Sequence, residues 1–142
     1  MFAVADDDAL DGTGAVTLVR ACYESFRTEL GLAGSQWTCS CDACTRIDQL
    51  DLKFVLHHGT YIAQAIAGHE ELLGPDVIVA HRLLKNHVRD QLGPVAYALI
   101  TDAAVDALGV PTDGMVATVE SYEDAGAVPV RILVLSEARA TA

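Results

Sequence analysis

The most informative hydrophobic pattern lies in residues 50–86, where the spacing of apolar positions changes along the chain. Apolar residues alternate with polar ones over residues 52–57, which is the period-2 pattern of a half-buried strand. A second alternating run covers residues 61–66, and Gly59 stands between the two runs as a turn residue. We therefore predict that residues 52–57 and 61–66 form two antiparallel strands of one hairpin, followed by another turn at Ala67 and Gly68.

Two stretches carry apolar residues at the spacing of a helix. Residues 13–31 predict an amphipathic helix that covers one face of a sheet and stops at Gly31. Its apolar face is formed by Val16, Val19, Tyr23, Phe26 and Leu30. A second helix is expected to start at Pro75 and Asp76, because proline fits the first helical turn and a carboxylate suits the positive end of the dipole. Its core face is expected to comprise Val77, Ala80, His81, Leu84 and Val88.

The remaining patterns predict four further strands and a short helix. The strands cover residues 1–5, 95–100, 115–122 and 128–135. The first of them ends in an acidic turn, Asp6 to Asp8, which we interpret as solvated surface. Thr101 and Asp102 open a helix that ends at Gly109, and residues 136–142 form a flexible tail. Strands interleaved with helices, several of them joined as hairpins, predict an α+β fold with mixed or antiparallel pairing.

Length and charge narrow the functional classes. The chain has 142 residues and a mass of 15.0 kDa, which fits one domain over residues 1–142. Its net charge of −11 opposes binding to nucleic-acid phosphates and to anionic membrane surfaces, so we expect neither as a partner. No apolar run approaches the ~18 residues of a membrane-spanning helix, and no signal-peptide pattern opens the sequence. A cytoplasmic location is the resulting expectation.

A cluster of cysteines marks the polar segment 33–49, which reads as an insertion. Cys39, Cys41 and Cys44 offer three thiolates within six positions, close enough to converge on one Zn²⁺ or iron–sulfur site if a fourth ligand joins them. The candidates for that ligand are Cys22, His57 and His58. The alternative is a set of three reduced, neutral thiols in a cytosolic loop, which needs no fourth ligand.

The order of elements in the central segment resembles a known family. A hairpin around His-x-Gly, then Leu-Gly-x-x-Val-x-x-Ala-x-Arg on a helix, resembles the second half of class III nucleotidyl cyclase catalytic domains, where the segment reads Trp-Gly-x-x-Val-Asn-x-Ala-x-Arg. Here Leu73 takes the Trp position and Ile78 the Asn position. The matching residues are Gly74, Val77, Ala80 and Arg82. The sequence from Leu-Asp-Leu-Lys-Phe-Val to His-Arg-Leu-Leu-Lys-Asn resembles an uncharacterised bacterial family of cyclase-related proteins of unknown function more closely than it resembles the cyclases themselves.

The resemblance carries expectations about fold and chemistry. It implies a ferredoxin-like, nucleotide-cyclase-like sheet with helices on one face and with the N-terminal part missing, including the strands that would carry the two metal-binding aspartates. In that family the Asn orients a ribose and the Arg stabilises charge on the reacting phosphate, which makes Arg82 a candidate phosphate contact. The candidate ligand-binding residues are Asp76, Ile78, Arg82 and Lys85. The alternative for Arg82 is a helix-surface side chain paired with an acidic neighbour.

Two functional hypotheses follow. In the first, the chain is a catalytically silent cyclase-homology domain that binds a small anionic ligand or serves as an assembly module. In the second, it is the C-terminal part of a working cyclase-like enzyme whose metal ligands come from missing or partner sequence. Because cyclase-family sites form between two domains, we expect a homodimer or a partner domain. The five histidines show no motif spacing, and we interpret them as turn, core-edge or surface residues.

Overall fold

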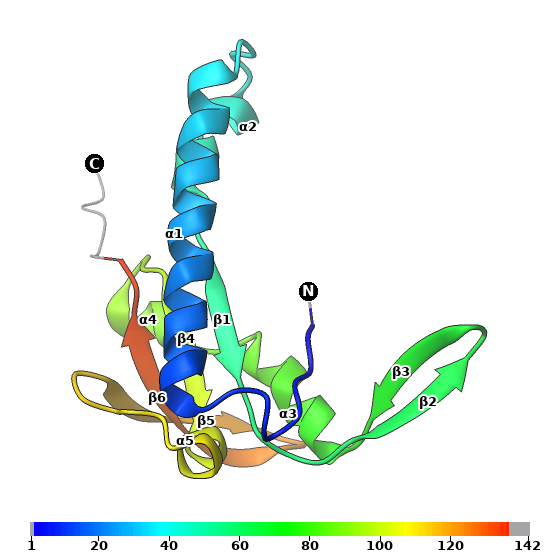
Figure 1. The fold of residues 1–142 in the computed structure, drawn as a ribbon. Helices are drawn as coiled ribbons and strands as arrows, with labels where there is room; N and C mark the ends of the chain where they lie inside the picture. Colours follow the sequence, from blue (N-terminus) through cyan, green and yellow to red (C-terminus); the bar gives the residue numbers. More distant parts are fainter. Residues whose placement is uncertain (1, 137–142) are drawn as a thin grey trace.

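A four-stranded mixed sheet forms the centre of the computed structural model, which describes residues 2–136 (Figure 1). Its strands are β1 (Lys53–Leu56), β4 (Tyr97–Thr101), β5 (Val116–Tyr122) and β6 (Gly126–Val134). They lie in the order β1-β4-β6-β5, with β1 parallel to β4 and the other two pairs antiparallel. The predicted α+β class with mixed pairing is confirmed.

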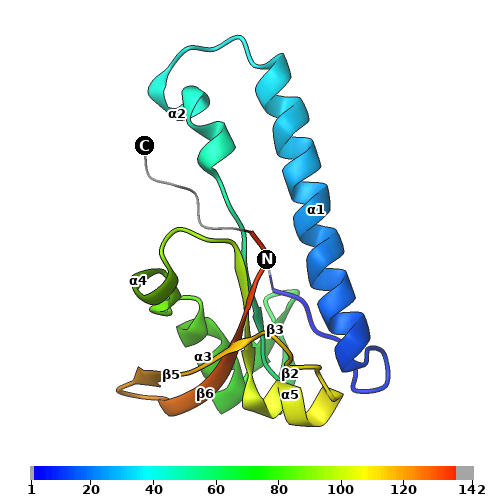
Figure 2. The ribbon, with the colours of Figure 1, turned by 90° about the vertical axis from the view of Figure 1, so that its left-hand side faces the viewer.

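Helices cover both faces of this sheet, so the expectation of helices on one face is wrong. Figure 2 shows α1 (Gly12–Gln36) and α5 (Asp102–Leu108) on one side of the strands, and α3 (Pro75–Leu83) and α4 (Val88–Leu92) on the other. The physical reason lies in β4, whose five residues are all buried. A strand that is apolar on both faces must be covered on both.

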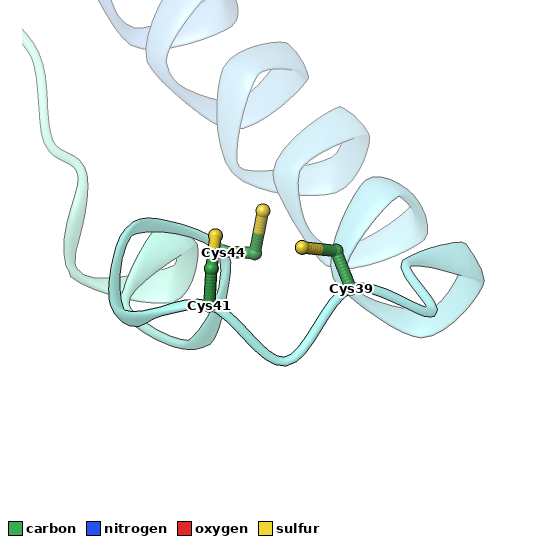
Figure 3. Close-up of side chains that lie close together, drawn as sticks. All are labelled: Cys39, Cys41 and Cys44. Atoms are coloured by element: carbon green, nitrogen blue, oxygen red, sulfur yellow. The ribbon is translucent and has the colours of Figure 1, made fainter.

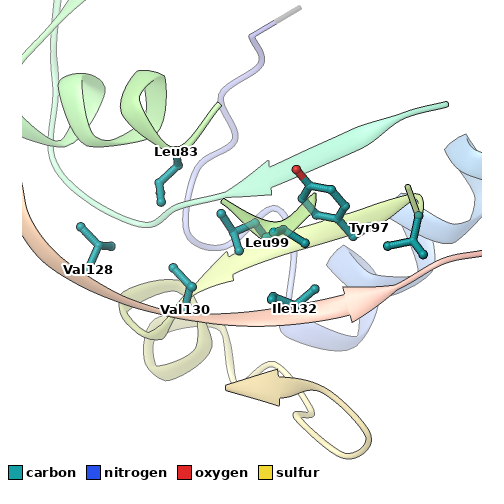
Figure 4. Packing of buried hydrophobic residues seen from close by; sticks show 8 residues of the cluster. Leu83, Tyr97, Leu99, Val128, Val130 and Ile132 are labelled. Atoms are coloured by element: carbon teal, nitrogen blue, oxygen red, sulfur yellow. The ribbon is translucent and has the colours of Figure 1, made fainter. Parts of the chain in front are cut away.

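The side chains of β4 divide the core into two clusters. Tyr97 and Leu99 point to one face, where they pack with Leu83 of α3 and with β6 residues (Figure 4). Ala98 and Ile100 point to the opposite face. There they join Val19 of α1, Ala104 of α5, Val110 and Leu133. The last predicted strand, residues 128–135, is expected to bury Val128, Val130, Ile132 and Val134. The first three are buried, whereas Val134 is 40% exposed.

Helix α1 has the predicted apolar face but a different end. Val19, Tyr23 and Leu30 are buried, and the Asp11 carboxylate caps the helix by accepting the backbone N–H of Gly14 at 2.6 Å. The predicted stop at Gly31 is wrong, because the helix continues to Gln36. An interior glycine costs a helix about 1 kcal/mol, which the neighbouring helix-forming leucines and alanine offset.

The hairpin of the central segment is formed by other strands than predicted. β1 pairs with β4, whereas β2 (Ile62–Ile66) pairs with β3 (His69–Leu73). The turn at Ala67 and Gly68 is confirmed, and both residues have positive φ (52° and 83°), as a tight two-residue hairpin loop requires. The predicted strand over residues 1–5 is also wrong, since residues 2–6 form no strand.

The predicted helix from Pro75 to Val88 is two helices. α3 ends at Leu83 and α4 begins at Val88, because the Asn86 side chain serves both ends. Its amide donates to the carbonyl of Leu83 at 2.7 Å, and its oxygen accepts the backbone N–H of Val88 at 3.2 Å. This break rotates the helix faces, so that Leu83 and Val88 are buried while Leu84 is 42% exposed.

The remaining predictions concern the C-terminal half and the ends. The helix capped by Thr101 is confirmed, with Gly109 in the left-handed conformation at its end (φ 66°). The hairpin of β5 and β6 is confirmed as well. The predicted flexible tail lies outside the described residues except for Ser136. Among residues 2–136, no helix combines the length and apolar character needed to cross a membrane.

Candidate functional sites

A cavity of about 430 Å³ lies between the N-terminal segment and the start of α3. Its walls come from residues 2–8, from the loop 57–61, from Leu72 of β3 and from Asp76, Val77 and Ala80 of α3. The cavity therefore forms where β1 ends and α3 begins. Three consecutive aspartates of the N-terminal segment and Asp76 make the lining acidic.

Three residues that line the cavity, His57, Thr60 and Asp76, form a polar network with the buried Thr101. His57 is 11% exposed and its Nε2 lies 3.2 Å from the Asp76 carboxylate, while its Nδ1 lies 3.0 Å from the Thr101 hydroxyl. The Thr101 hydroxyl oxygen also accepts the backbone N–H of Ala104 at 3.2 Å, so Thr101 links His57 to the start of α5 while His57 faces the Asp76 carboxylate.

The same carboxylate also accepts the backbone N–H of Thr60 at 2.8 Å. This bond, followed by the contact with His57, lowers the pKa of Asp76 below its usual 3.8. Every member of the network has its partner, and the network joins the end of β1 to the starts of α3 and α5. We interpret it as a structural connection. His57, the last residue of the predicted strand 52–57, lies directly after β1, and the Nε2 of His58 lies 3.1 Å from the Asp7 carboxylate.

The predicted ligand-binding residues of α3 and of the turn that follows it, where Lys85 lies, do not converge on one site. Asp76 belongs to the polar network, whereas Arg82 pairs with Asp124 in the turn between β5 and β6. This ion pair lowers the pKa of Asp124. Ile78, one turn before Arg82, is 52% exposed, and Lys85 is exposed. The guanidinium of Arg82 thus has a carboxylate partner at the surface, with both side chains about half exposed.

A buried carboxylate that sequence reasoning missed lies on the opposite side of the sheet from α1. Glu120 of β5 is 1% exposed. Its carboxylate accepts a hydrogen bond from the backbone N–H of His87 at 3.1 Å and contacts the His87 Nδ1 at 2.9 Å. The hydrogen bond and charge of Glu120 raise the pKa of His87. Burial, and then the same carboxylate, raise the pKa of Tyr122 to about 12. Pairing with the buried Val128 places Glu120 on the core side, a register that the sequence of β5 alone does not indicate.

The three predicted cysteine ligands do converge. The Sγ atoms of Cys39, Cys41 and Cys44 all lie within 4.8 Å of one another, and their side chains point toward a common centre (Figure 3). We call these residues the thiol cluster. The backbone N–H of Cys44, followed by the neighbouring thiols, lowers the pKa of Cys41 to about 7. The two neighbouring thiols raise the pKa of Cys44.

The fourth ligands predicted from sequence do not reach the thiol cluster. Among the described residues, no other cysteine, histidine, aspartate or glutamate joins the group. His57 and His58 are bonded elsewhere, and Cys22 lies exposed on α1. The predicted insertion 33–49 contains the end of α1, the helix α2 (Asp42–Thr45) and the short 3-10 helix η1 (Ile47–Gln49).

Comparison with known proteins defines the family but not an activity. Residues 2–91 match the family described as "Protein of unknown function (DUF2652)", and the chain belongs to this family. It is similar to the "Uncharacterized protein Rv2561/Rv2562" of Mycobacterium tuberculosis, with 37% identity over 86 residues. The match covers 60% of this chain and 38% of that protein, so the chain spans well under half of its relative. No solved structure matches the chain.

Proposed function

We propose that the chain is a catalytically silent cyclase-homology domain that acts as an assembly module and pairs with a second copy through its β2–β3 hairpin. Figure 1 shows this hairpin, residues 62–73, projecting away from the sheet. We call it the arm. All five residues of β2 are exposed, and only one residue of β3 is partly covered.

The arm carries exposed apolar side chains that nothing in the described chain covers. Because residues alternate across a strand and Ile62 pairs with Leu73, the side chains of Ile62, Ile66 and Leu73 share one face. The polar residues of that face are Gln64, His69 and Glu71. Ile62, Ile66 and Leu73 are 69%, 46% and 43% exposed. A lone two-stranded hairpin is marginally stable in water, so contact with a second copy would stabilise the arm and cover its exposed apolar side chains. This observation carries the proposal.

Charge predicts how such assembly depends on salt. Two copies that each carry −11 repel one another over distances of about 10 Å at 0.1 M salt. Added salt screens this repulsion while leaving the apolar contact intact. Association through the arm should therefore strengthen as salt is raised, which is the opposite of association through ion pairs.

The proposed lack of activity rests on two positions of α3. In the cyclase family that the chain resembles, the equivalent of Ile78 hydrogen-bonds the substrate ribose, which an isoleucine cannot do. Arg82, the candidate phosphate contact, is held by Asp124. The acidic Glu123 lies beside this pair, so the surroundings of Arg82 disfavour an anion. For this reason we favour assembly over binding of a small anionic ligand.

Two activity assays test the silent state. The purified chain should form no cyclic nucleotide from ATP or GTP with Mg²⁺ or Mn²⁺, and product above a heat-killed control would contradict this. The alternative, a cyclase-like enzyme whose metal ligands lie outside this chain, predicts product from a longer gene product or from a mixture with a partner. If neither the longer gene product nor the mixture forms cyclic nucleotide, the enzyme alternative is refuted and the silent assembly module is retained.

Assembly is tested by sedimentation equilibrium over micromolar concentrations. Full burial of an isoleucine contributes about 1.5–3 kcal/mol, so covering the exposed parts of Ile62 and Ile66 in both copies contributes ~4 kcal/mol, or about a thousandfold in Kd. The double variant Ile62→Ser/Ile66→Ser should therefore shift the dimer to monomer.

The matched control is Val119→Ser, which removes an equally exposed apolar side chain (55%) from β5, outside the arm. It should leave the mass unchanged. A monomeric wild-type chain throughout, or equal loss of dimer in both variants, would refute the proposal.

A further inference from the structure

We propose that the thiol cluster binds one Zn²⁺ through Cys39, Cys41 and Cys44, and leaves the fourth coordination position to solvent or an external ligand. This inference is independent of the proposed function. It rests on the placement of the three sulfur atoms, on the weak anchoring of the segment around them and on the residues available nearby.

The sulfur positions suit a tetrahedral ion. A Zn–S bond of about 2.3 Å places two sulfurs of a tetrahedral site about 3.8 Å apart, and the three Sγ atoms lie within 4.8 Å of one another. Cys41 precedes α2 directly and Cys44 lies within it, three positions on, so that both side chains lie on one side of this turn. Cys39 faces them from the loop after α1 (Figure 3). Shortening these separations by at most about 1 Å, shared between the two sulfurs of each pair, closes the site.

The segment that carries the cluster has few other anchors. Neither α2 nor η1 contains a buried residue, and Trp37 is 49% exposed. The described contacts that tie the segment to α1 include the Arg27 guanidinium, which donates to the carbonyls of Asp48 and Leu50 at 3.3 Å. A bound ion would fix the loop to α2 and so order a region that the hydrophobic core does not reach.

The surroundings define an open fourth position. Asp42, the nearest acidic residue in sequence, is engaged by Arg46, and no other protein ligand among residues 2–136 joins the cluster. A three-thiolate site differs from a closed four-cysteine site in that a water or a small thiol completes it. We therefore expect zinc that exchanges readily with a chelator.

The experiment is metal binding by the reduced full chain, with Co²⁺ as a spectroscopic substitute for Zn²⁺. One equivalent should bind and give a thiolate-to-metal charge-transfer band, which added Zn²⁺ displaces. Each of Cys39→Ser, Cys41→Ser and Cys44→Ser should weaken Zn²⁺ binding by about tenfold or more, because each removes one of three ligands. The control Cys22→Ser, an exposed cysteine outside the cluster, should bind like the wild type.

A second measurement separates binding from folding. Chelator should increase amide hydrogen exchange in residues 37–49 but leave the core strand β4 protected, since only the first region depends on the ion. The proposal is overturned if the reduced chain takes up less than about a tenth of an equivalent of Zn²⁺. It is also overturned if Cys22→Ser weakens Zn²⁺ binding as much as the cluster variants do, or if chelator leaves the amide hydrogen exchange of residues 37–49 unchanged.

Discussion

Replacing Asp76 by alanine should destabilise the fold by about 2 kcal/mol. The carboxylate accepts the backbone N–H of Thr60 at 2.8 Å and faces the Nε2 of His57 at 3.2 Å. Hydrogen bonds to a charged group contribute ~1.5–3 kcal/mol each. The Asp76 side chain is 36% exposed, so water replaces part of each bond and about 1 kcal/mol per bond remains, which gives ~2 kcal/mol for the two bonds. For a domain of this size the melting temperature should fall by ~7 °C.

The assay is urea denaturation followed by circular dichroism at several pH values. The pKa of Asp76 is lowered in the folded state, so its contribution is present above the unfolded value near 3.8 and is lost as pH falls through the folded pKa. The difference in unfolding free energy between the wild type and Asp76→Ala should therefore be largest at neutral pH and should decrease in acid. Asp42→Ala is the control, because its ion pair with Arg46 is 79% exposed on the carboxylate side and should matter little. Equal urea midpoints for Asp76→Ala and Asp42→Ala, or a difference between the wild type and Asp76→Ala that does not change with pH, would refute the reasoning.

Three further predictions concern α1, the core and the buried carboxylate. Gly31→Ala should stabilise the fold by about 0.5–1 kcal/mol, because the site is helical and open, whereas Gly12→Ala should destabilise it, because its Cβ would collide with the backbone after α5. Leu83→Ala should cost about 2–5 kcal/mol in the unfolding free energy, because the side chain is 0% exposed. Glu120 raises the pKa of His87, so this contribution to stability is full below pH 6.5 and is lost as pH rises through the folded value. His87→Ala should remove that pH dependence in the same urea assay.

Local periodicity predicted the elements better than their partners. The buried face of α1 and the helix from Thr101 to Gly109 follow from apolar spacing and capping residues that lie next to one another in sequence. The pairing partner of β1 does not follow from local spacing, because a period of two identifies a strand but does not indicate which strand it pairs with. Its parallel partner β4 is separated from it by the arm and two helices.

The candidate sites could likewise be predicted only where their residues are close together in the sequence. The thiol cluster could be predicted because its three ligands lie within six positions of the sequence, so that local geometry alone brings them together. The network of His57 could not, because Asp76 and Thr101 lie 19 and 44 positions away and meet it only through the fold. Glu120 was missed for the same reason, since its partner His87 lies 33 positions away.

Hydrogen exchange of the arm at several protein concentrations tests the central claim most directly. If a second copy stabilises the arm, the amides of β2 and β3 should exchange rapidly in dilute solution and become protected as concentration rises through the dimer Kd. The amides of β4, which is buried throughout, should stay protected at every concentration and serve as the internal reference. Arm amides whose protection does not change with concentration would contradict the proposal that the chain assembles through this hairpin.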